Sequence, residues 1–165
     1  YMPREELEKD IASGVVFWGA EQAGKLVGVM GLQRVRDVSL MRHAYVRTSA
    51  RGSGVGRALI GFLKTEAKLP ALVGTWTAAT WAVRFYRRNG FAPLIPKESG
   101  ELLRKYWSIP ARQTDTSLVL ADEAWFTAAG CRVGEYRYYF AYGSNMERKQ
   151  MAERCPEAHF RVRTR

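Results

Sequence analysis

Cysteine and histidine are scarce in this chain of 165 residues, which contains two of each. The two cysteines, Cys131 and Cys155, lie far apart and show no spacing typical of a metal site. This argues against a disulfide-stabilised scaffold, and we expect no bound metal. Free thiols are typical of a reducing compartment, so we expect a cytoplasmic protein.

Long apolar runs are absent as well. No run approaches the roughly 20 residues that a membrane-spanning helix needs, and no signal peptide is visible. We therefore expect no membrane partner. The chain opens with Tyr1 and not with Met, so we expect that some sequence upstream is missing.

Acidic residues are outnumbered, because 16 Asp and Glu face 26 Lys and Arg, which gives a formal net charge of +10. A basic protein can bind nucleic acid, an acidic surface or a phosphorylated small molecule. Arg161, Arg163 and Arg165 form a basic end of their own, for which a solvated tail is the favoured interpretation. The remaining composition is globular, with 47% apolar residues and five tryptophans.

The most informative stretch is Arg51-Gly52-Ser53-Gly54-Val55-Gly56-Arg57, between a strand-like run at 38–46 and a helix-like run at 55–68. The first amides of a helix have no partner within it and lie at the positive end of its dipole, so phosphate oxygens bind there. Glycines let the backbone approach a ligand, and arginines at both ends suit a diphosphate. By itself, the loop is equally compatible with a tight strand-to-helix turn.

The spacing argues against two familiar phosphate loops. No Lys-Ser or Lys-Thr pair follows the glycines, as a nucleotide P-loop requires. Arg57 stands where the dinucleotide fingerprint needs its third glycine, and no acidic residue follows at the required distance.

Tyr45-Val46 followed by this glycine loop resembles the acetyl-CoA loop of the GNAT acetyltransferase superfamily. The run from Ala82 to Phe91 resembles the late helix of that family and the Gly-Phe pair that follows it. The resemblance covers about residues 3–121. It implies an α/β (α+β) fold, a mixed and mostly antiparallel sheet with splayed central strands, flanked by helices. The strand and helix that open the family's fold are missing here, so we expect a domain truncated at its start.

Hydrophobic periodicity, turn residues and family analogy predict the elements of this domain, which we place at residues 1–128. The last strand is expected to pair beside the strand at 91–95. The expected helices are 3–12, 55–68, 79–88, 98–107 and 122–129, and the expected strands are 15–20, 26–35, 38–47, 71–77, 91–95 and 116–121.

Residues 129–165 are predicted to be a linker and an incomplete second domain. Within 136–165, the run Tyr142-Gly143-Ser144-Asn145 resembles the start of the gamma-glutamylcyclotransferase-like fold, where such a loop meets the substrate. The catalytic acid of that family lies further downstream and is not in this chain. The segment is too short to bury a core of its own.

The GNAT resemblance assigns most of the cofactor site. The backbones of Tyr45 and Val46 would pair with the pantetheine arm as an added strand, and the Val46 amide would donate to the thioester carbonyl. The diphosphate would lie on the loop, and Tyr86 would donate to the departing thiolate, with a core aromatic as the alternative. Ala79 replaces an asparagine that often contacts the pantetheine arm. The expected loop ligands are Arg51, Gly52, Ser53, Gly54, Val55, Gly56 and Arg57.

The general base and the acceptor pocket are less strongly indicated. His43 has a pKa suited to taking a proton from an amine, but a strand histidine is more often surface or core filler, and a water relay is a further alternative. Arg42 would attract an acidic acceptor, and Trp76 and Thr77 would line the pocket, with core packing equally favoured.

These observations favour an acetyl-CoA-dependent N-acetyltransferase, an acyltransferase that moves an acetyl group to a primary amine by direct attack. The expected acceptor is a small molecule or a protein amine. The family resemblance also implies a homodimer formed through sheet edges. The alternative is a catalytically weak acyl-CoA-binding domain that regulates a fused gamma-glutamylcyclotransferase-like domain. A nucleic-acid module ranks last, because no helix-turn-helix and no aromatic single-strand signature is present.

Overall fold

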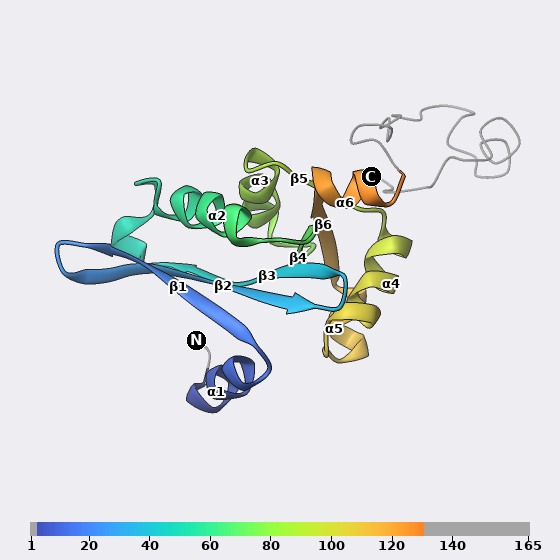
Figure 1. Ribbon diagram of the computed structural model, residues 1–165, viewed down its shortest axis with the longest axis horizontal. Helices are drawn as coiled ribbons and strands as arrows, with labels where there is room; N and C mark the ends of the chain where they lie inside the picture. Colours follow the sequence, from blue (N-terminus) through green and yellow to red (C-terminus); the bar gives the residue numbers. More distant parts are fainter. Residues whose placement is uncertain (1–2, 131–165) are drawn as a thin grey trace, which may run out of the picture. The chain divides into compact units, whose positions relative to one another are not determined.

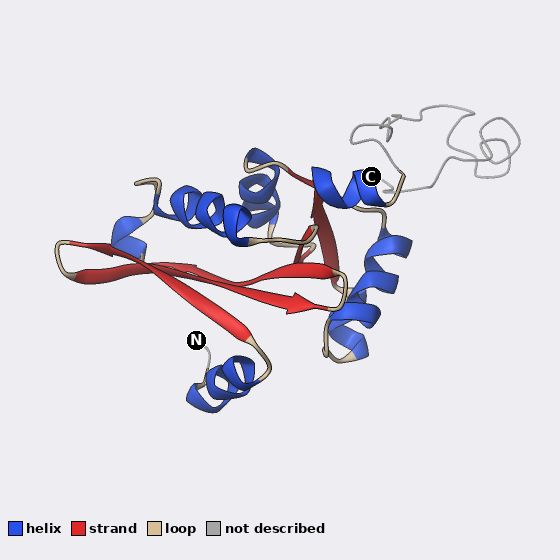
Figure 2. Ribbon diagram, in the orientation of Figure 1, coloured by secondary structure: helices blue, strands red, loops and turns tan. Residues whose placement is uncertain are grey.

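The computed structural model describes residues 3–130, and Figures 1 and 2 show their arrangement. The predictions for Cys131, Cys155 and the run Tyr142-Gly143-Ser144-Asn145 lie outside the described residues. The proposed second domain at 129–165 therefore stays a prediction.

A six-stranded sheet forms the centre of the described chain, with the strand order β1-β2-β3-β4-β6-β5. Neighbouring strands are antiparallel except for β3 and β4, which are parallel. The expected pairing of the last strand with β5 is confirmed, and the same strand, β6, also pairs with β4. The strands are β1 Val15–Gln22, β2 Lys25–Val35, β3 Val38–Val46, β4 Ala71–Trp76, β5 Phe91–Pro93 and β6 Ser117–Asp122.

Helices cover both faces of the sheet, and most of them lie where the sequence predicts. The helix α5 and the 3-10 turn η1 were not predicted, because such short pieces show no hydrophobic periodicity. The helices are α1 Arg4–Ala12, η1 Thr48–Ala50, α2 Val55–Glu66, α3 Thr80–Arg88, α4 Pro96–Tyr106, α5 Ala111–Asp115 and α6 Glu123–Ala128.

The core lies in two clusters, one on each face of the sheet. The first cluster packs α2 and α3 on one face, through side chains that include Leu59, Leu63 and Ala82. The second packs α4 and α6 on the other face, through side chains that include Leu103 and Phe126. Alternate residues of a strand point to opposite faces of the sheet, so neighbouring strand residues contribute to different core clusters.

Helical spacing predicts that the buried face of α2 consists of Val55, Leu59, Phe62 and Leu63, and this prediction is wrong for Phe62. Its side chain is 47% exposed, and Ile60 is fully buried. Phe62 instead meets the Trp18 ring edge-on, with 6.1 Å between ring centroids. The hydrophobic stripe of α2 is therefore rotated slightly from the expected one.

The central strands separate, as the sequence resemblance predicted. β3 and β4 pair only from Ser39 and Ala71 to Met41 and Val73, and beyond these residues no pairing follows. Each strand nevertheless continues, β3 to Val46 and β4 to Trp76. We call the space between these two strand ends the sheet opening.

A β-bulge at His43 precedes the sheet opening. The register between β2 and β3 shifts between Val29 and Gly31, and His43 has a left-handed φ of 53°. Met41 and Ala44 both pack into the first core cluster although they are three residues apart. The bulge therefore moves the inward-outward alternation of β3 by one residue and bends the strand.

Candidate active site

The glycine loop joins η1 to α2 and depends on two left-handed residues. Gly52 has a φ of 79° and Gly54 a φ of 88°, values that other residues adopt at a cost. A Cβ atom at either position would meet nothing within 4 Å. The glycines are therefore needed for the backbone, and the space beside both of them is open.

The start of α2 offers unpaired amides beside that open space. Gly54 is the N-cap residue, no side chain caps the helix, and the first backbone bond runs from the Ala58 amide to Gly54 O at 2.9 Å. Within residues 3–130, the amides of Val55, Gly56 and Arg57 have no acceptor. They lie at the positive end of the helix dipole and can hold phosphate oxygens.

Ser53 and Gly56 have structural tasks in this loop. The Ser53 hydroxyl donates to Ala50 O at 2.7 Å, which closes the turn. A Cβ at Gly56 would lie 3.3 Å from the Phe85 ring, so the glycine lets α3 pack closely on α2. A Cβ at Gly28 would lie 2.6 Å from Val55, which shows how closely α2 begins above the sheet.

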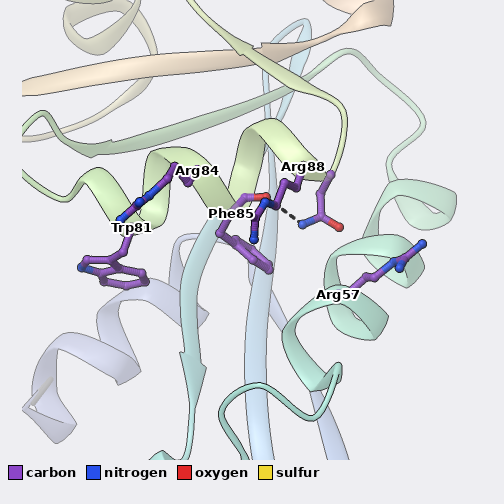
Figure 3. A pocket seen from close by; sticks show the side chains of 6 residues that line it. Arg57, Trp81, Arg84, Phe85 and Arg88 are labelled. Atoms are coloured by element: carbon purple, nitrogen blue, oxygen red, sulfur yellow. Dashed lines mark hydrogen bonds between the residues drawn. The ribbon is translucent and has the colours of Figure 1, made fainter.

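A hollow of about 550 Å³ lies between α2 and α3, next to the helix start (Figure 3). We call it the arginine hollow, because three of its six lining residues are arginines and none is acidic. Arg57 comes from α2, whereas the remaining residues come from α3 and its C-terminal end. The lining residues are Arg57, Trp81, Arg84, Phe85, Arg88 and Asn89.

Sequence reasoning found Arg57 but missed Arg84 and Arg88. The signal was present, because Trp81, Arg84 and Arg88 are three and four residues apart and therefore share one face of a helix. Arg51, the other predicted arginine, lies at the C-cap of η1 and does not line the hollow.

Hydrogen bonds hold the two walls of the arginine hollow in place. The Asn89 amide nitrogen Nδ2 donates to Phe85 O at 2.8 Å, the contact drawn as a dashed line in Figure 3. Lys64 Nζ, from α2, donates to Asn89 O at 3.1 Å. The end of α3 is thus tied to α2.

The backbone of Val46 faces the sheet opening. The Arg47 amide donates to Val27 O at 2.8 Å, on the β2 side of the strand. Because successive residues of an extended strand direct their amides to opposite sides, the Val46 amide and carbonyl point away from β2. They point toward β4, with which β3 forms no backbone pairs after Met41.

The side chain of Tyr86, a residue of α3, lies in the first core cluster, and 8% of its surface is exposed. Its ring packs edge-on against Phe85 and Phe91, with centroid distances of 5.2 and 6.2 Å. Burial raises the pKa of the Tyr86 hydroxyl to about 12. The hydroxyl is therefore protonated at any neutral pH and can act as a hydrogen-bond donor.

His43 and Arg42 meet Asp10 on the opposite face of the sheet. Figure 1 shows α1, which carries Asp10, on the side of the first strands that faces away from α2. Arg42 Nη2 lies 3.2 Å from Asp10 Oδ1, and His43 Nε2 lies 2.8 Å from Asp10 Oδ2. The imidazole N–H is not directed at that oxygen, so Nε2 makes a close contact without a proper hydrogen bond.

The imidazole of His43 is neutral at pH 7. Burial lowers its pKa below the ordinary 6.5, and the neighbouring Arg42 guanidinium lowers it further. The carboxylates of Asp10 and Glu6 raise the pKa but do not compensate for these effects. A neutral imidazole can accept a proton.

The predicted acceptor residues are not gathered in one place. Arg42 is already engaged, because Nη1 donates to Gln33 Oε1 at 2.9 Å and Nη2 meets Asp10. Trp76 ends β4 with 63% of its surface exposed. The exposed Thr77 follows it, and its amide donates to Thr116 O at 3.0 Å. Of these three, Trp76 and Thr77 keep exposed side chains at the end of β4, whereas Arg42 does not.

The arrangement of elements can be compared with known proteins. A family model described as the acetyltransferase (GNAT) domain matches residues 13–93. This span includes the sheet opening, the glycine loop, the arginine hollow and Tyr86. Residues 13–93 are therefore similar to a GNAT acetyltransferase domain. No curated protein sequence matches the chain.

Solved structures confirm the GNAT fold. A GNAT family acetyltransferase from Elizabethkingia anophelis with acetyl-CoA bound is 15% identical over 73% of this chain and 82% of its own, with a TM-score of 0.56. The IAA acetyltransferase from Bacillus cereus ATCC 14579 is 19% identical over 73% and 84%, with a TM-score of 0.56. A GNAT acetyltransferase from Staphylococcus aureus Mu50 is 21% identical over 72% and 74%, with a TM-score of 0.55.

Two further findings concern the part of the chain that the structure describes. Residues 3–130 contain no group of three or more His, Cys, Asp or Glu side chains that could hold a metal ion. In the same part of the chain, every helix is too short or too polar to cross a membrane.

Proposed function

We propose that this GNAT domain transfers the acetyl group of acetyl-CoA to a primary amine by direct attack at the sheet opening. The observation that carries this proposal is the separation of β3 and β4 after Met41 and Val73, directly beside the unpaired amides that begin α2. A strand-like ligand fits between the strands, and its phosphates then reach the helix start.

The phosphates of the cofactor would lie on the α2 face of the sheet. The amides of Val55, Gly56 and Arg57 suit the diphosphate, and the open space beside Gly52 and Gly54 admits it. The arginine hollow continues from there and offers three guanidinium groups for the remaining phosphate charge. The similar structure from Elizabethkingia anophelis holds acetyl-CoA, which supports this assignment.

The thioester would be held by backbone groups of β3. The Val46 amide and carbonyl face the opening and suit the pantetheine arm and the thioester carbonyl, whose charge grows as the amine attacks. By the same alternation the backbone of Tyr45 points toward β2. Tyr45 therefore contributes its half-exposed ring to the site and not its backbone.

The amine would approach from the face that carries α1. There the nitrogen attacks the thioester carbon, and its proton passes to His43, while the carbon–sulfur bond breaks and the thiolate leaves. Asp10 lies against Nε2 at 2.8 Å, so Nδ1 is the nitrogen that would take the proton. Tyr86 lies on the cofactor face and donates to the departing sulfur, which its protonated state allows.

One observation favours the alternative of a catalytically weak acyl-CoA-binding domain. Ala79 is the N-cap residue of α3 and makes no side-chain cap, where the family often has an asparagine for the pantetheine arm. A missing hydrogen bond to the arm lowers cofactor affinity. A regulatory role toward a fused cyclotransferase-like domain concerns residues outside 3–130 and rests on the sequence resemblance alone.

Calorimetry with acetyl-CoA, followed by thiol release with a panel of primary amines, tests the proposal. Gly54→Glu should abolish binding, because it places a carboxylate at the helix start. Gly54→Ala is the matched control, since it carries the same left-handed strain without the charge and should retain most of the affinity. Wild-type binding without turnover on any amine would favour the alternative, and equal binding by Gly54→Glu would refute the phosphate site.

A further inference from the structure

A second hollow, of about 120 Å³, lies on the face of the sheet opposite the arginine hollow. We call it the tryptophan pocket. It is built from the end of β4, the end of α4, the segment that follows α4, and α5. Its principal lining residues are Gly74, Trp76, Leu103, Trp107, Ile109 and Gln113.

The strand end that lines this pocket is also one side of the sheet opening. Gly74 and Trp76 follow Val73, the last residue of β4 that pairs with β3. Leu72 packs into the second core cluster, and residues two apart on a strand share a face, so Gly74 and Trp76 point to the side of α4. The pocket therefore begins where the acetyl group would be transferred.

His43 lies on this same face, on the other side of the opening. Trp18 and Ala20 of β1 pack into the first cluster, under α2, so Phe17 between them points to the opposite face. The His43 ring lies 5.6 Å from the Phe17 ring, measured between centroids. The proposed base and the tryptophan pocket thus lie on one side of the sheet, with the opening between them.

The absence of a side chain at Gly74 shapes the pocket. A Cβ atom there would lie 3.3 Å from the Trp107 indole, so the ring packs directly against the strand. The indole thereby forms one wall, and Trp76 forms another with 63% of its surface exposed. An exposed tryptophan beside a concave apolar surface is typical of a ligand site.

The lining contains no charged residue, although the chain carries a net charge of +10. A charged group placed in the pocket would lose water without gaining a partner. The volume is close to that of apolar cavities of about 150 Å³, which take up a benzene molecule. Charge and size together indicate a ring or a branched alkyl group, with Thr75, Gln113 and Ser117 as the polar lining residues.

We propose that the tryptophan pocket binds the apolar substituent of the acceptor, and that the acceptor is a small primary amine carrying an aryl or branched alkyl group. This inference rests on the proposed acetyl transfer at the sheet opening. The amine nitrogen then lies near His43 and the thioester, and the ring lies between Trp76 and Trp107.

A pair of amines tests the pocket through turnover. The ratio of kcat/KM for 2-phenylethylamine to that for ethylamine should be at least about tenfold in the wild type. Trp76→Ala should reduce this ratio several-fold. Phe62→Ala, which removes another exposed aromatic remote from β4, should leave the ratio unchanged. Equal kcat/KM values for the two amines, or an unchanged ratio in Trp76→Ala, would overturn the inference.

A binding experiment separates this inference from the proposed function. 2-Phenylethanol carries the ring but no amine, and tryptophan fluorescence reports its binding in the presence of CoA. The spectral change should shrink in Trp76→Phe, which leaves Trp107 as the remaining reporter, and persist in Trp18→Phe, whose tryptophan packs against the first core cluster on the other face of the sheet. That result without acetylation of any amine would support the pocket and refute the transferase activity. No spectral change in the wild type, or a change lost in Trp18→Phe alone, would overturn the pocket.

Discussion

At the scale of single residues, the proposed proton transfer depends on His43. Its imidazole is neutral, because burial and Arg42 lower its pKa, and Asp10 opposes this effect. The same carboxylate contacts both His43 and Arg42 and therefore fixes the orientation of the ring. In the proposed mechanism Asp10 is thus a positioning residue, whereas His43 is the group that would contact the amine.

The first prediction concerns the pH dependence of turnover. A base works in its neutral form, so kcat/KM should fall as the pH drops through a His43 pKa below 6.5 and should not depend on His43 above it. Asp10→Asn removes a group that raises this pKa, so the acidic limb should move to lower pH, and kcat should fall. His43→Gln should lose the limb and about 10²-fold in rate. An unchanged limb in His43→Gln would exclude it as the base.

At the scale of elements, the pairing of α2 with α3 creates the cofactor face. Gly56 lets the helices approach closely, and the contacts of Lys64 and Asn89 join their ends. The dipole of α2 and the arginines of α3 then act on the same space. Neither helix alone would hold three phosphate groups, because each supplies charge on one side of the hollow.

The second prediction follows from this pairing. Arg84→Glu and Arg88→Glu should each weaken CoA binding about tenfold at low salt, because each loses a charged hydrogen bond and adds repulsion. Arg87→Glu is the matched control, since the same charge change falls on the same helix outside the hollow. The difference should shrink as ionic strength rises. Calorimetry at two salt concentrations measures this effect, and equal weakening by all three variants would show that net charge alone matters.

At the scale of the whole described molecule, the sheet lies between the proposed cofactor face and the proposed acceptor pocket. The first core cluster supports the cofactor face, and the second supports α4 and the tryptophan pocket. The helix α1 differs from the other long helices because it has no buried residue. Polar contacts hold it, chiefly those of Asp10 with Arg42 and of Gln33 with Ser13.

The third prediction is that α1 serves catalysis more than folding. A chain that begins at Ser13 should still unfold cooperatively, with a loss of only about 1–2 kcal/mol, since only polar surface contacts are removed. Its turnover should fall to that of Asp10→Asn, because both lack the carboxylate at His43. Urea unfolding followed by circular dichroism measures the stability. A truncated chain that does not fold would show that α1 belongs to the core.

The sequence predicted most elements, and it proposed the glycine loop of the candidate site. Periodicity and turn residues placed the strands and the long helices, because these patterns repeat within one element. The bulge at His43 was not predicted, because the residues around it do not alternate clearly between apolar and polar side chains and so do not reveal the shift in alternation. Arg84, Arg88 and the partners of Gly74 were missed because their neighbours come from other parts of the chain.

What the amino-acid sequence determined by itself is local: a loop whose glycines permit left-handed backbone and a helix start with unpaired amides. The tertiary structure alone decided which groups share a face. It placed Asp10 against His43, the arginines of α3 across from Arg57, and Trp107 over Gly74. The physical reason is that these contacts depend on how strands separate and helices pack, which is a property of the folded sheet and not of any single segment.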